Sequence, residues 1–404
     1  MFFSKSRTYH DPIHGAITLN GGDRTESLLI QLIDTPEFQR LRRIRQLDIA
    51  AFTFHGAEGS RFTHALGVMA LTRRAFDAIA LEYPYLAMHR PVALVAALLH
   101  DLGHGPYSHA AEEVFHSQHE IWTLNLLKFG KIGELLHDFS EQLLPDLEQV
   151  FTKQYAVPFV YQLVSSQIDC DRLDYLQRDS YFTGAHYGNL DLDRILLAMR
   201  FDPISQTLVI GRKGMVAIEH YLTVRHFMYL QVYNHPKNLA ARFGLERIFK
   251  RAKILIKSAT LFCDRTMLPW LTQDPQTITC EQYIAADDVV LNYHIHQWRN
   301  SSDRLLADLC RRFQDRDLLR ATDISHLDDR QQQESLEQWQ TKLTAQGLEP
   351  KYYSSIRVAR TKGYSIYKQG INIQTDQGLR DIASLSPLVQ AITQPNQKTW
   401  LLHP

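Results

Sequence analysis

An apolar stretch that ends in glycines and histidines is the feature that most limits how this chain can fold. Residues 91–99 are almost all apolar, and the segment HDLGHG (100–105) and Pro106 follow directly. A helix that is apolar on every side is buried in the middle of a fold, so we expect such a helix over 92–102. The glycines and the proline end it there. Histidine and aspartate side chains are therefore expected at the centre of the molecule.

Helical periodicity dominates the chain up to residue 262. Thr35 as an N-cap followed by Pro36 predicts a helix over 36–47, and apolar residues at three- and four-residue steps predict another over 60–81. Further helices are expected over 118–147, 159–179, 219–232 and 239–261. Two short β-hairpins are expected, one within 9–20 and one pairing 204–210 with 215–218.

The composition changes after residue 263. Residues 264–345 are polar and charged, with a helical fragment at 302–313 and a glutamine-rich part at 331–340 that is expected to be solvated. Aromatic and β-branched residues over 352–373 predict a few strands. We therefore expect a mainly α-helical fold with small β-hairpins, a helical core over residues 1–262 and a mixed C-terminal lobe over 263–404.

Charge and cysteine content narrow the class of protein. The 404 residues include 44 Lys plus Arg and 44 Asp plus Glu, so a globally basic nucleic-acid binder is not expected. No apolar run is long enough to span a bilayer, and the first residues show no secretory signal. The four cysteines have no CxxC spacing and are interpreted as reduced thiols. A cytoplasmic protein with no membrane segment is the expectation.

Two histidines and two aspartates stand on three predicted helices. His100 and Asp101 end the buried helix, His64 lies near the start of the preceding helix, and Asp171 lies on a later one. Imidazole nitrogens together with carboxylate oxygens suit zinc, manganese or iron. A core histidine bonded to a neighbouring carboxylate is the plainer alternative, and the pair alone does not exclude it.

Several motifs occur in a fixed order along the chain. They are DPIHG (11–15), IDTPEFQRLRRIRQL (33–47), SRFTHALGV (60–68), HDLGHGPYSH (100–109), QHE (118–120) and DCDRLDYLQRD (169–179). With them the chain resembles the dNTP triphosphohydrolase branch of the HD superfamily, in the group that contains the mammalian sterile-alpha-motif and HD-domain dNTPase. The resemblance runs from about residue 11 to about 313, and it makes the first 262 residues an HD-domain catalytic core.

The resemblance implies hydrolysis of a dNTP to deoxynucleoside and tripolyphosphate by a homo-oligomer, a dimer or a tetramer. It implies one divalent metal ion (manganese, iron, zinc, nickel or magnesium) on the ligands His64, His100, Asp101 and Asp171. The family's site histidines correspond to His104, His109 and His119, and its orienting carboxylate to Glu112. His104 is expected to handle the proton at the α-phosphorus, as general acid or as activator of water.

The same resemblance assigns the substrate contacts. The phosphate clamps would be Arg61, Arg172 and Arg225, and the sugar contacts would be Gln46, Leu47, Tyr175, Asp179 and Tyr233. Leu47 and Tyr233 would crowd a 2′-hydroxyl and so exclude ribonucleotides. The chain departs from the family at Asp48, where glycine is expected, and at Arg172, where lysine is common.

A regulatory site is a separate expectation. The family's guanine-binding site between subunits corresponds to Asp34, Gln39 and Arg42, with Arg7 as a phosphate contact, which implies activation by GTP or dGTP. A nucleic-acid patch and a solvated helix face are alternative interpretations of the arginines in 40–45. Two rival functions stay open. The same site could act on another nucleotide or phosphate ester, or the chain could be a nucleotide-sensing or single-strand nucleic-acid-binding protein.

Overall fold

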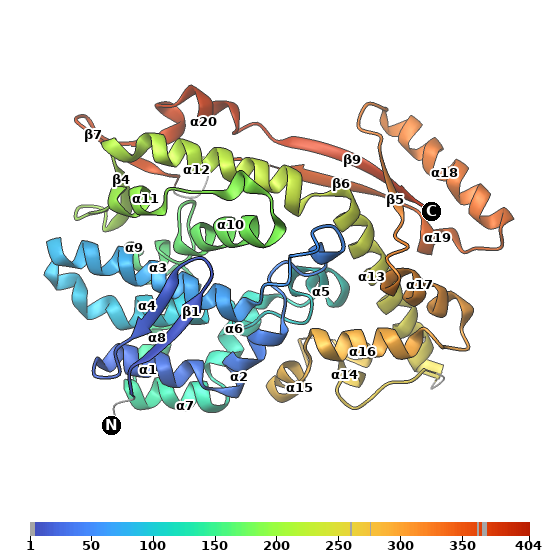
Figure 1. The fold of residues 1–404 in the computed structure, drawn as a ribbon, viewed down its shortest axis with the longest axis horizontal. Coiled ribbons are helices and arrows are strands. Elements are labelled where there is room, and N and C mark those ends of the chain that lie inside the picture. The colour runs from blue at the N-terminus through green and yellow to red at the C-terminus, as the bar shows by residue number, and fades with distance from the viewer. Residues whose placement is uncertain (1–4, 259–260, 275, 362, 366–369) are drawn as a thin grey trace.

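The fold is mainly α-helical, as expected (Figure 1). A computed structural model describes residues 5–258, 261–274, 276–361, 363–365 and 370–404. The helices around the candidate site are α3 (Arg61–Glu82), α4 (Arg90–Leu99), α5 (Ser108–Phe115), α6 (His119–Leu127), α10 (Cys170–Thr183), α12 (Met215–Met228) and α13 (Pro236–Leu255). Other helices of the first half are α1 (Arg24–Ile33), α2 (Pro36–Gln39), α7 (Gly130–Phe139), α8 (Leu143–Phe151), α9 (Pro158–Gln162) and α11 (Leu192–Ala198).

The apolar helix is buried at the centre, as the sequence predicts. Every residue of α4 from Val92 to Leu99 is buried, and α3 packs along it. The helix ends at Leu99, three residues before the predicted end, because the segment after it turns away. A Cβ at Gly103 would lie 2.1 Å from the backbone oxygen of His119, so only glycine lets the start of α6 approach this turn. The break therefore brings two histidine-bearing segments together.

The helix predicted over 36–47 is shorter than expected. After α2 the chain forms a single 3₁₀ turn at Arg40–Arg43 and then leaves the helical path. The Arg40 guanidinium is buried and donates to the backbone oxygens of His104 (2.8 Å) and Ala286 (3.1 Å). The helix ends where this side chain enters the interior. The turn that follows places Gln46 and Leu47 on the wall of the candidate site.

The first predicted hairpin is present and the second is different. Strands β1 (Arg7–Asp11) and β2 (Gly15–Leu19) pair as an antiparallel hairpin. The predicted pairing of 204–210 with 215–218 is wrong, because β4 (Thr207–Gly211) pairs instead with the preceding strand β3 (Met199–Asp202). Residues 203–206 form the turn, where Ile204 is 93% exposed, and Met215 already begins α12.

The C-terminal part contains short helices and two small sheets. Its helices are α14 (Leu268–Thr272), α15 (Cys280–Ala285), α16 (Asp288–Trp298), α17 (Arg304–Gln314), α18 (Asp329–Ala345), α19 (Pro350–Tyr353) and α20 (Pro387–Ala391). Its strands are β5 (Arg320–Asp323), β6 (Ser355–Thr361), β7 (Asn372–Thr375), β8 (Gly378–Asp381) and β9 (Asn396–His403). The strand orders are β3-β4-β7-β8 and β5-β9-β6. No residue of the glutamine-rich part, 331–340, is buried, as expected.

The end of the chain returns to the first half. Helix α20 lies above α12, and β7 pairs in parallel with β4 (Figure 1). The boundary at residue 262 stays a prediction. Parts of two expected elements lie outside the described residues, namely 259–260 of the helix over 239–261, and 362 and 366–369 of the strands over 352–373.

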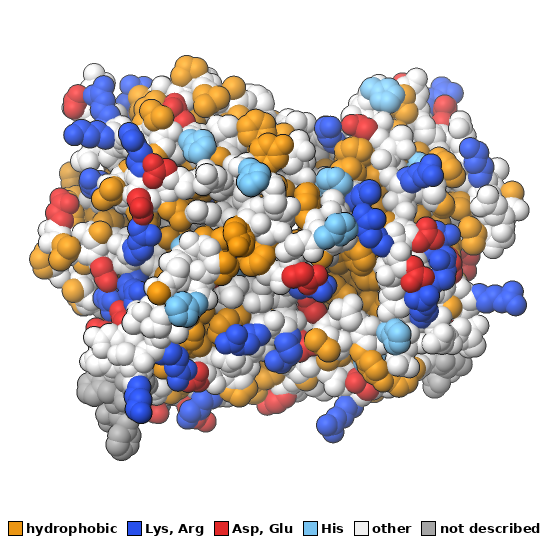
Figure 2. All heavy atoms as spheres, in the orientation of Figure 1, with side chains coloured by type: hydrophobic (Ala, Val, Ile, Leu, Met, Phe, Trp, Pro, Cys, Tyr) orange, Lys and Arg blue, Asp and Glu red, His pale blue; other side chains and the backbone are white. Residues whose placement is uncertain are grey.

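Two features bear on the class of protein, namely the length of the apolar helices and the distribution of charged side chains on the surface. Among the described residues, no helix has the length and apolar character needed to cross a bilayer. Lys and Arg side chains alternate with Asp and Glu side chains on the face that Figure 2 shows. This mixture agrees with the balanced composition and offers no continuous basic stripe on that face.

Candidate active site

A cavity of about 390 Å³ lies where α3, α5, α6 and α10 meet the turn that follows α12. That turn, Tyr229–Tyr233, is a π-helix, a form often found at functional sites. The predicted residues on the cavity wall are Gln46, Leu47, Arg61, Asp101, His104, His109, His119, Asp171, Arg172, Tyr175, Asp179 and Tyr233. The other predicted residues of the site, His64, His100, Glu112 and Arg225, are not on this wall.

Four side chains converge behind one end of the cavity. The Nε2 atoms of His64 and His100 are 3.2 Å apart. His64 Nε2 is 3.1 Å from Asp171 Oδ1 and 3.5 Å from Asp101 Oδ2, and His100 Nε2 is 3.3 Å from Asp101 Oδ1. Ligand atoms at right angles around a metal with bonds of about 2.1 Å stand about 3 Å apart. The spacing therefore fits one metal ion.

The hydrogen bonds behind the two rings support the same conclusion. His64 Nδ1 lies 2.7 Å from Asp174 Oδ2, and His100 Nδ1 lies 2.9 Å from the backbone oxygen of Ala97. Both partners only accept, so each Nδ1 carries a hydrogen and each Nε2 faces the space between the two rings. Burial opposes a charge on His64, but hydrogen bonds to Asp171 and Asp174 outweigh it and raise the pKa to about 10. This centre favours a cation, and its ligand set fits a divalent metal.

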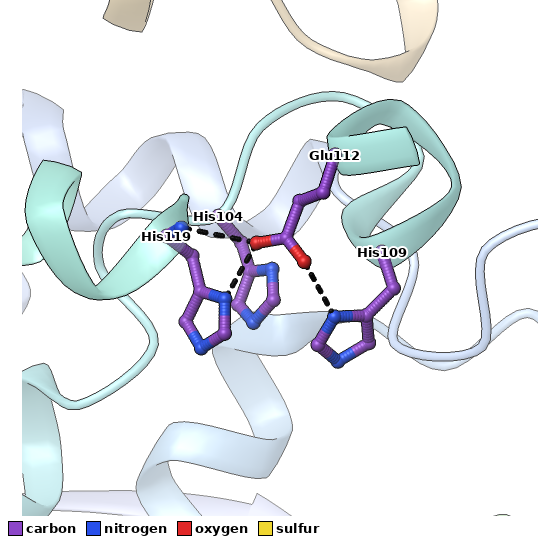
Figure 3. A group of neighbouring side chains, drawn as sticks. All are labelled: His104, His109, Glu112 and His119. Atoms are coloured by element: carbon purple, nitrogen blue, oxygen red, sulfur yellow. Dashed lines mark hydrogen bonds and ion pairs between the residues drawn. The ribbon is translucent and has the colours of Figure 1, made fainter. Parts of the chain in front are cut away.

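A second group of histidines lies beside the first and is organised by Glu112. Its Oε2 accepts from His109 Nδ1 (2.8 Å), and its Oε1 accepts from His119 Nδ1 (2.5 Å) and from the His119 backbone (3.0 Å). Figure 3 shows the far nitrogens of the rings pointing away from the carboxylate. The rings of His104 and His119 stack at 4.0 Å. Because stacked rings do not aim at one point, this group suits an anion better than a second metal.

The surroundings of these histidines push their protonation in opposite directions. Burial, together with the neighbouring Arg61 and His119, holds the pKa of His104 well below its ordinary value. Burial also opposes charge on His119, yet the hydrogen bond to Glu112 raises its pKa overall. Two stacked imidazoles thus have pKa values shifted in opposite directions. His104 Nδ1 is buried and has no hydrogen-bond partner among the described residues.

Two of the three predicted phosphate clamps line the cavity. Arg61 donates through Nε to Ser108 Oγ (2.8 Å) and through Nη1 to Asp101 Oδ2 (2.5 Å). Arg172 is oriented by its Nε, which donates to the backbone oxygen of Ser166 (2.8 Å). The third, Arg225, donates to Gln167 Oε1 (3.2 Å) and lies 5.7 Å from the ring of Tyr229, which does line the cavity.

The predicted sugar contacts lie together on the same cavity wall. Tyr233 donates its hydroxyl to Asp179 Oδ2 (2.8 Å), and the Tyr175 ring stands edge-on to the Tyr233 ring at 6.0 Å. Burial raises the pKa of Asp179 to about 7. Gln46 Oε1 is buried and finds no hydrogen-bond partner in the described part of the chain. A buried acceptor on a cavity wall is costly unless a ligand satisfies it, so this corner is suited to a ligand hydroxyl.

Asp48 and Arg242 both line the cavity and pair with each other, a contact that the sequence did not predict. Asp48 has a φ of 45°, in the left-handed region, which explains why glycine is the expected residue there. Its Oδ2 accepts from Arg242 Nη2 (2.8 Å), so the added carboxylate is paired rather than facing a substrate unpaired. The two residues are 194 positions apart in sequence, so no local pattern could reveal the pair.

The predicted regulatory residues lie together on the surface. Arg7 pairs with Asp34 at 2.5 Å, and Gln39 donates to the backbone oxygen of Ile33, next to Asp34. Arg42 donates to Gln39 Oε1 (2.7 Å). These contacts make one polar patch, whose ligand is untested.

Comparisons with known proteins agree with this geometry. Residues 61–136 match the model of the HD domain, and residues 190–403 match that of the HD associated region. The chain is 36% identical over 400 residues to the uncharacterized protein YwfO of Bacillus subtilis, which covers 96% of this chain and 90% of that protein.

More distant relatives carry a described activity. The chain is 33% identical over 245 residues to the deoxynucleoside triphosphate triphosphohydrolase SAMHD1 of Danio rerio, covering 51% of this chain and 38% of that protein. It is 29% identical to the Homo sapiens protein of the same name, covering 57% of this chain and 42% of that protein.

A solved structure shares the whole fold. The crystal structure of a phosphohydrolase from Bacteroides thetaiotaomicron superposes with a TM-score of 0.88 at 28% identity, covering 99% of this chain and 100% of that chain. The family models, the full-length relative and the ligand set at the break after α4 agree. The chain is therefore an HD-type phosphohydrolase and belongs to the HD-domain family related to deoxynucleoside triphosphate triphosphohydrolases.

Proposed function

We propose that this protein hydrolyses deoxynucleoside triphosphates to deoxynucleoside and tripolyphosphate. One observation carries the proposal. A single cavity adjoins a candidate cation centre, has arginines and histidines on its wall, and includes Gln46, whose Oε1 has no partner among the described residues. The names of the SAMHD1 relatives support the same activity.

The residues of the cation centre would set where the reaction occurs. A divalent ion on His64, His100, Asp101 and Asp171 would polarise an α-phosphate oxygen and offset the charge that develops there. Arg61 and Arg172 would hold the phosphate chain by paired N–H donors. Much of the acceleration would then come from positioning and from pre-arranged positive charge.

The second histidine group would handle protons and bind the other phosphates. His109 and His119 give their Nδ1 atoms to Glu112, so their Nε2 atoms remain for the substrate. In this arrangement they would serve as donors toward phosphate or the leaving oxygen. The surroundings of His104 favour its role as a neutral acceptor that activates water, one of the two roles expected for it.

The remaining cavity residues would select the sugar. Gln46 and Asp179 would bind the 3′-hydroxyl, and the bulk of Leu47 and Tyr233 would leave no room for a 2′-hydroxyl. Tyr175 would pack against the sugar. A site built this way rejects a wrong sugar because it leaves either a clash or an unpaired polar group.

Regulation and assembly belong to the same proposal. In a homo-oligomer, Asp34, Gln39 and Arg42 would bind the guanine of GTP or dGTP, and Arg7 would contact its phosphates. The contacts within the patch support a polar ligand, and the oligomer is suggested by the related enzymes alone.

A product assay tests the proposal. Protein loaded with manganese is incubated with each dNTP alone, with all four together, and with GTP, and products are separated by ion exchange. The expected products are deoxynucleoside and tripolyphosphate, and turnover only in mixtures would add nucleotide activation. His104→Ala should lose turnover, whereas His137→Ala, an exposed residue on α7, should not.

Other products would redirect the assignment. Orthophosphate alone, or turnover of ribonucleotides alone, would point to another phosphate ester as the substrate. Binding of single-stranded nucleic acid without any turnover, in every metal tried, would favour the binding protein.

A further inference from the structure

The carboxylate behind His64 is saturated with hydrogen bonds. Asp174 accepts on Oδ1 from His14 Nε2 (2.5 Å) and Arg178 Nη2 (2.9 Å), and on Oδ2 from His64 Nδ1 (2.7 Å) and Arg178 Nε (2.7 Å). A carboxylate has about four lone-pair sites, so none is left. The side chains of Asp174 and Arg178 are fully buried, and that of His14 is 7% exposed.

His14 reaches this carboxylate from a distant part of the chain. It stands in the turn between β1 and β2, 160 residues from Asp174. Asp11 shapes that turn, because its Oδ1 accepts from the backbone of Ile13 (2.9 Å) and of His14 (2.9 Å). Gly15 closes it with a φ of +69°. The motif DPIHG is thus a small scaffold that presents one imidazole to the interior.

Arg178 joins the turn to the helix. Besides its two bonds to Asp174, it donates through Nη1 to Asp11 Oδ2 (2.8 Å). The helix that carries His64, α3, has a glycine, Gly67, where it passes these two side chains. A Cβ at Gly67 would lie 1.9 Å from Asp174 Oδ1 and 2.6 Å from Arg178 Nη2. Three separate elements, the β1–β2 turn, α3 and α10, are therefore fitted around one hydrogen bond to the His64 ring.

We propose that the β1–β2 turn is a positioning element of the metal centre, in which His14 and Asp11 act through Asp174 and Arg178 on His64. The inference rests on the metal centre of the proposed function and adds residues outside the HD-domain match. With four donors on Asp174, neither the carboxylate nor the His64 ring can rotate freely. The bare Nε2 lone pair of His64 is then held toward the ion. Loss of such an orienting partner usually costs about 10- to 100-fold in metal affinity.

Three variants separate this role from simple packing. His14→Phe keeps a ring and removes the N–H donor, whereas His14→Gln keeps an N–H near the position of Nε2. His10→Phe makes the same change on the exposed side of the same hairpin. Manganese affinity is measured on the metal-free protein by competition with a fluorescent chelator, and metal content by mass spectrometry. Thermal unfolding of the metal-free forms reports any general loss of stability.

We expect His14→Phe to bind manganese about 10- to 100-fold more weakly, His14→Gln to regain most of that affinity, and His10→Phe to match the wild type. If His14→Phe does not fold, His14→Asn takes its place, because its shorter amide cannot reach Asp174. Wild-type affinity in His14→Phe would overturn the inference, even if that variant melts earlier. An equal loss in His14→Gln would also overturn it.

The outcomes for the two proposals are distinct. His64→Ala should lose the manganese site, and unchanged binding in that variant would overturn the positioning role. A wild-type protein that binds manganese through His64 but releases no tripolyphosphate would contradict the proposed function alone. The effect of His14→Phe on affinity would still support the positioning role.

Discussion

The histidines of the candidate site form two neighbouring groups. In both groups, hydrogen bonds at Nδ1 orient the imidazole rings. In the group of His64 and His100, each Nδ1 is tied to an acceptor and the Nε2 atoms converge to 3.2 Å. In the group around Glu112, His109 and His119 also give their Nδ1 atoms to an acceptor, but the rings of His104 and His119 lie parallel. The two groups differ in where the neighbouring carboxylates lie relative to the rings.

The placement of the carboxylates decides which ion each group attracts. Asp101 and Asp171 lie in front of the free nitrogens of the first group, so negative charge meets the lone pairs and a cation completes the centre. Glu112 lies behind the second group, where its hydrogen bond raises the pKa of His119, and Arg61 lines the same cavity. In the proposed roles, the same residue type thus serves a cation site and an anion site side by side. This comparison can be tested one group at a time.

The largest loss of turnover is expected when the group of His64 and His100 is changed. His64→Ala removes a ligand and should lower turnover about 1,000-fold, because the charge stabilisation that a metal supplies amounts to several kcal/mol. Metal content, measured by mass spectrometry, should fall with it. His137→Ala, on the surface of α7, is the matched control and should change neither quantity. Full activity in metal-free His64→Ala would show that the cation centre is not part of the reaction.

An intermediate effect is expected from the second group. Glu112→Gln keeps the shape but removes the charge behind His109 and His119, and turnover should fall about 100-fold. Because the hydrogen bond to Glu112 raises the pKa of His119, the basic limb of the pH–rate profile should move to lower pH.

Metal content separates the two groups in this experiment. It should stay at the wild-type level in Glu112→Gln, and the exposed neighbour Glu113→Gln should behave as wild type throughout. Loss of metal in Glu112→Gln would remove the distinction between the two groups.

Much of this site could be predicted from sequence because its residues sit in contiguous motifs. The buried helix, the glycine break and the order of His64, His100, Asp101 and Asp171 all follow local patterns, and the structure brings these four residues together. The roles drawn from the resemblance stay predictions.

What the sequence did not reveal depends on long-range contacts. Asp174 and Arg178 look like an ordinary ion pair one turn apart on a helix, and nothing local shows that His64 and His14 share that carboxylate. The helix over 36–47 was overextended because burial of Arg40 beneath His104 has no local signal. The second hairpin was shifted because Ile204 has strand character but lies in an exposed turn, while β4 takes its partners from β3 and from β7.

An effect of a different kind, on stability rather than on turnover, tests the sugar corner. Burial raises the pKa of Asp179 to about 7, above the ordinary value of 3.8. The folded protein therefore binds this proton more tightly than the unfolded chain, and stability is lost as the pH rises from about 4 to 7. Asp179→Asn removes that loss and should stabilise the fold above pH 7 by up to about 4 kcal/mol.

Thermal unfolding across pH checks this expectation. The gain of Asp179→Asn over the wild type should be near zero at pH 4, grow toward pH 7 and stay level above it, while turnover falls. The exposed substitution Asp138→Asn should show no such pH trend. A gain that is the same at every pH would mean that the carboxylate is not held in the environment described.

The smallest change in turnover is expected from substitutions in the surface patch of Arg7, Asp34, Gln39 and Arg42, where regulation is proposed. The Arg42 guanidinium lies 3.6 Å from the Phe62 ring centroid, and Phe62 is the neighbour of the phosphate clamp Arg61 on α3. A nucleotide that orders Arg42 would therefore act one residue from the cavity. Typical couplings of this kind change affinity about 5-fold or more, and Arg42→Ala should abolish GTP stimulation without changing unstimulated turnover. Arg24→Ala removes a similar exposed stack, on Phe139 at 4.4 Å, and should leave the stimulation intact. Wild-type turnover that is equal with and without GTP would contradict the regulatory role and leave the two histidine groups as the whole of the working site.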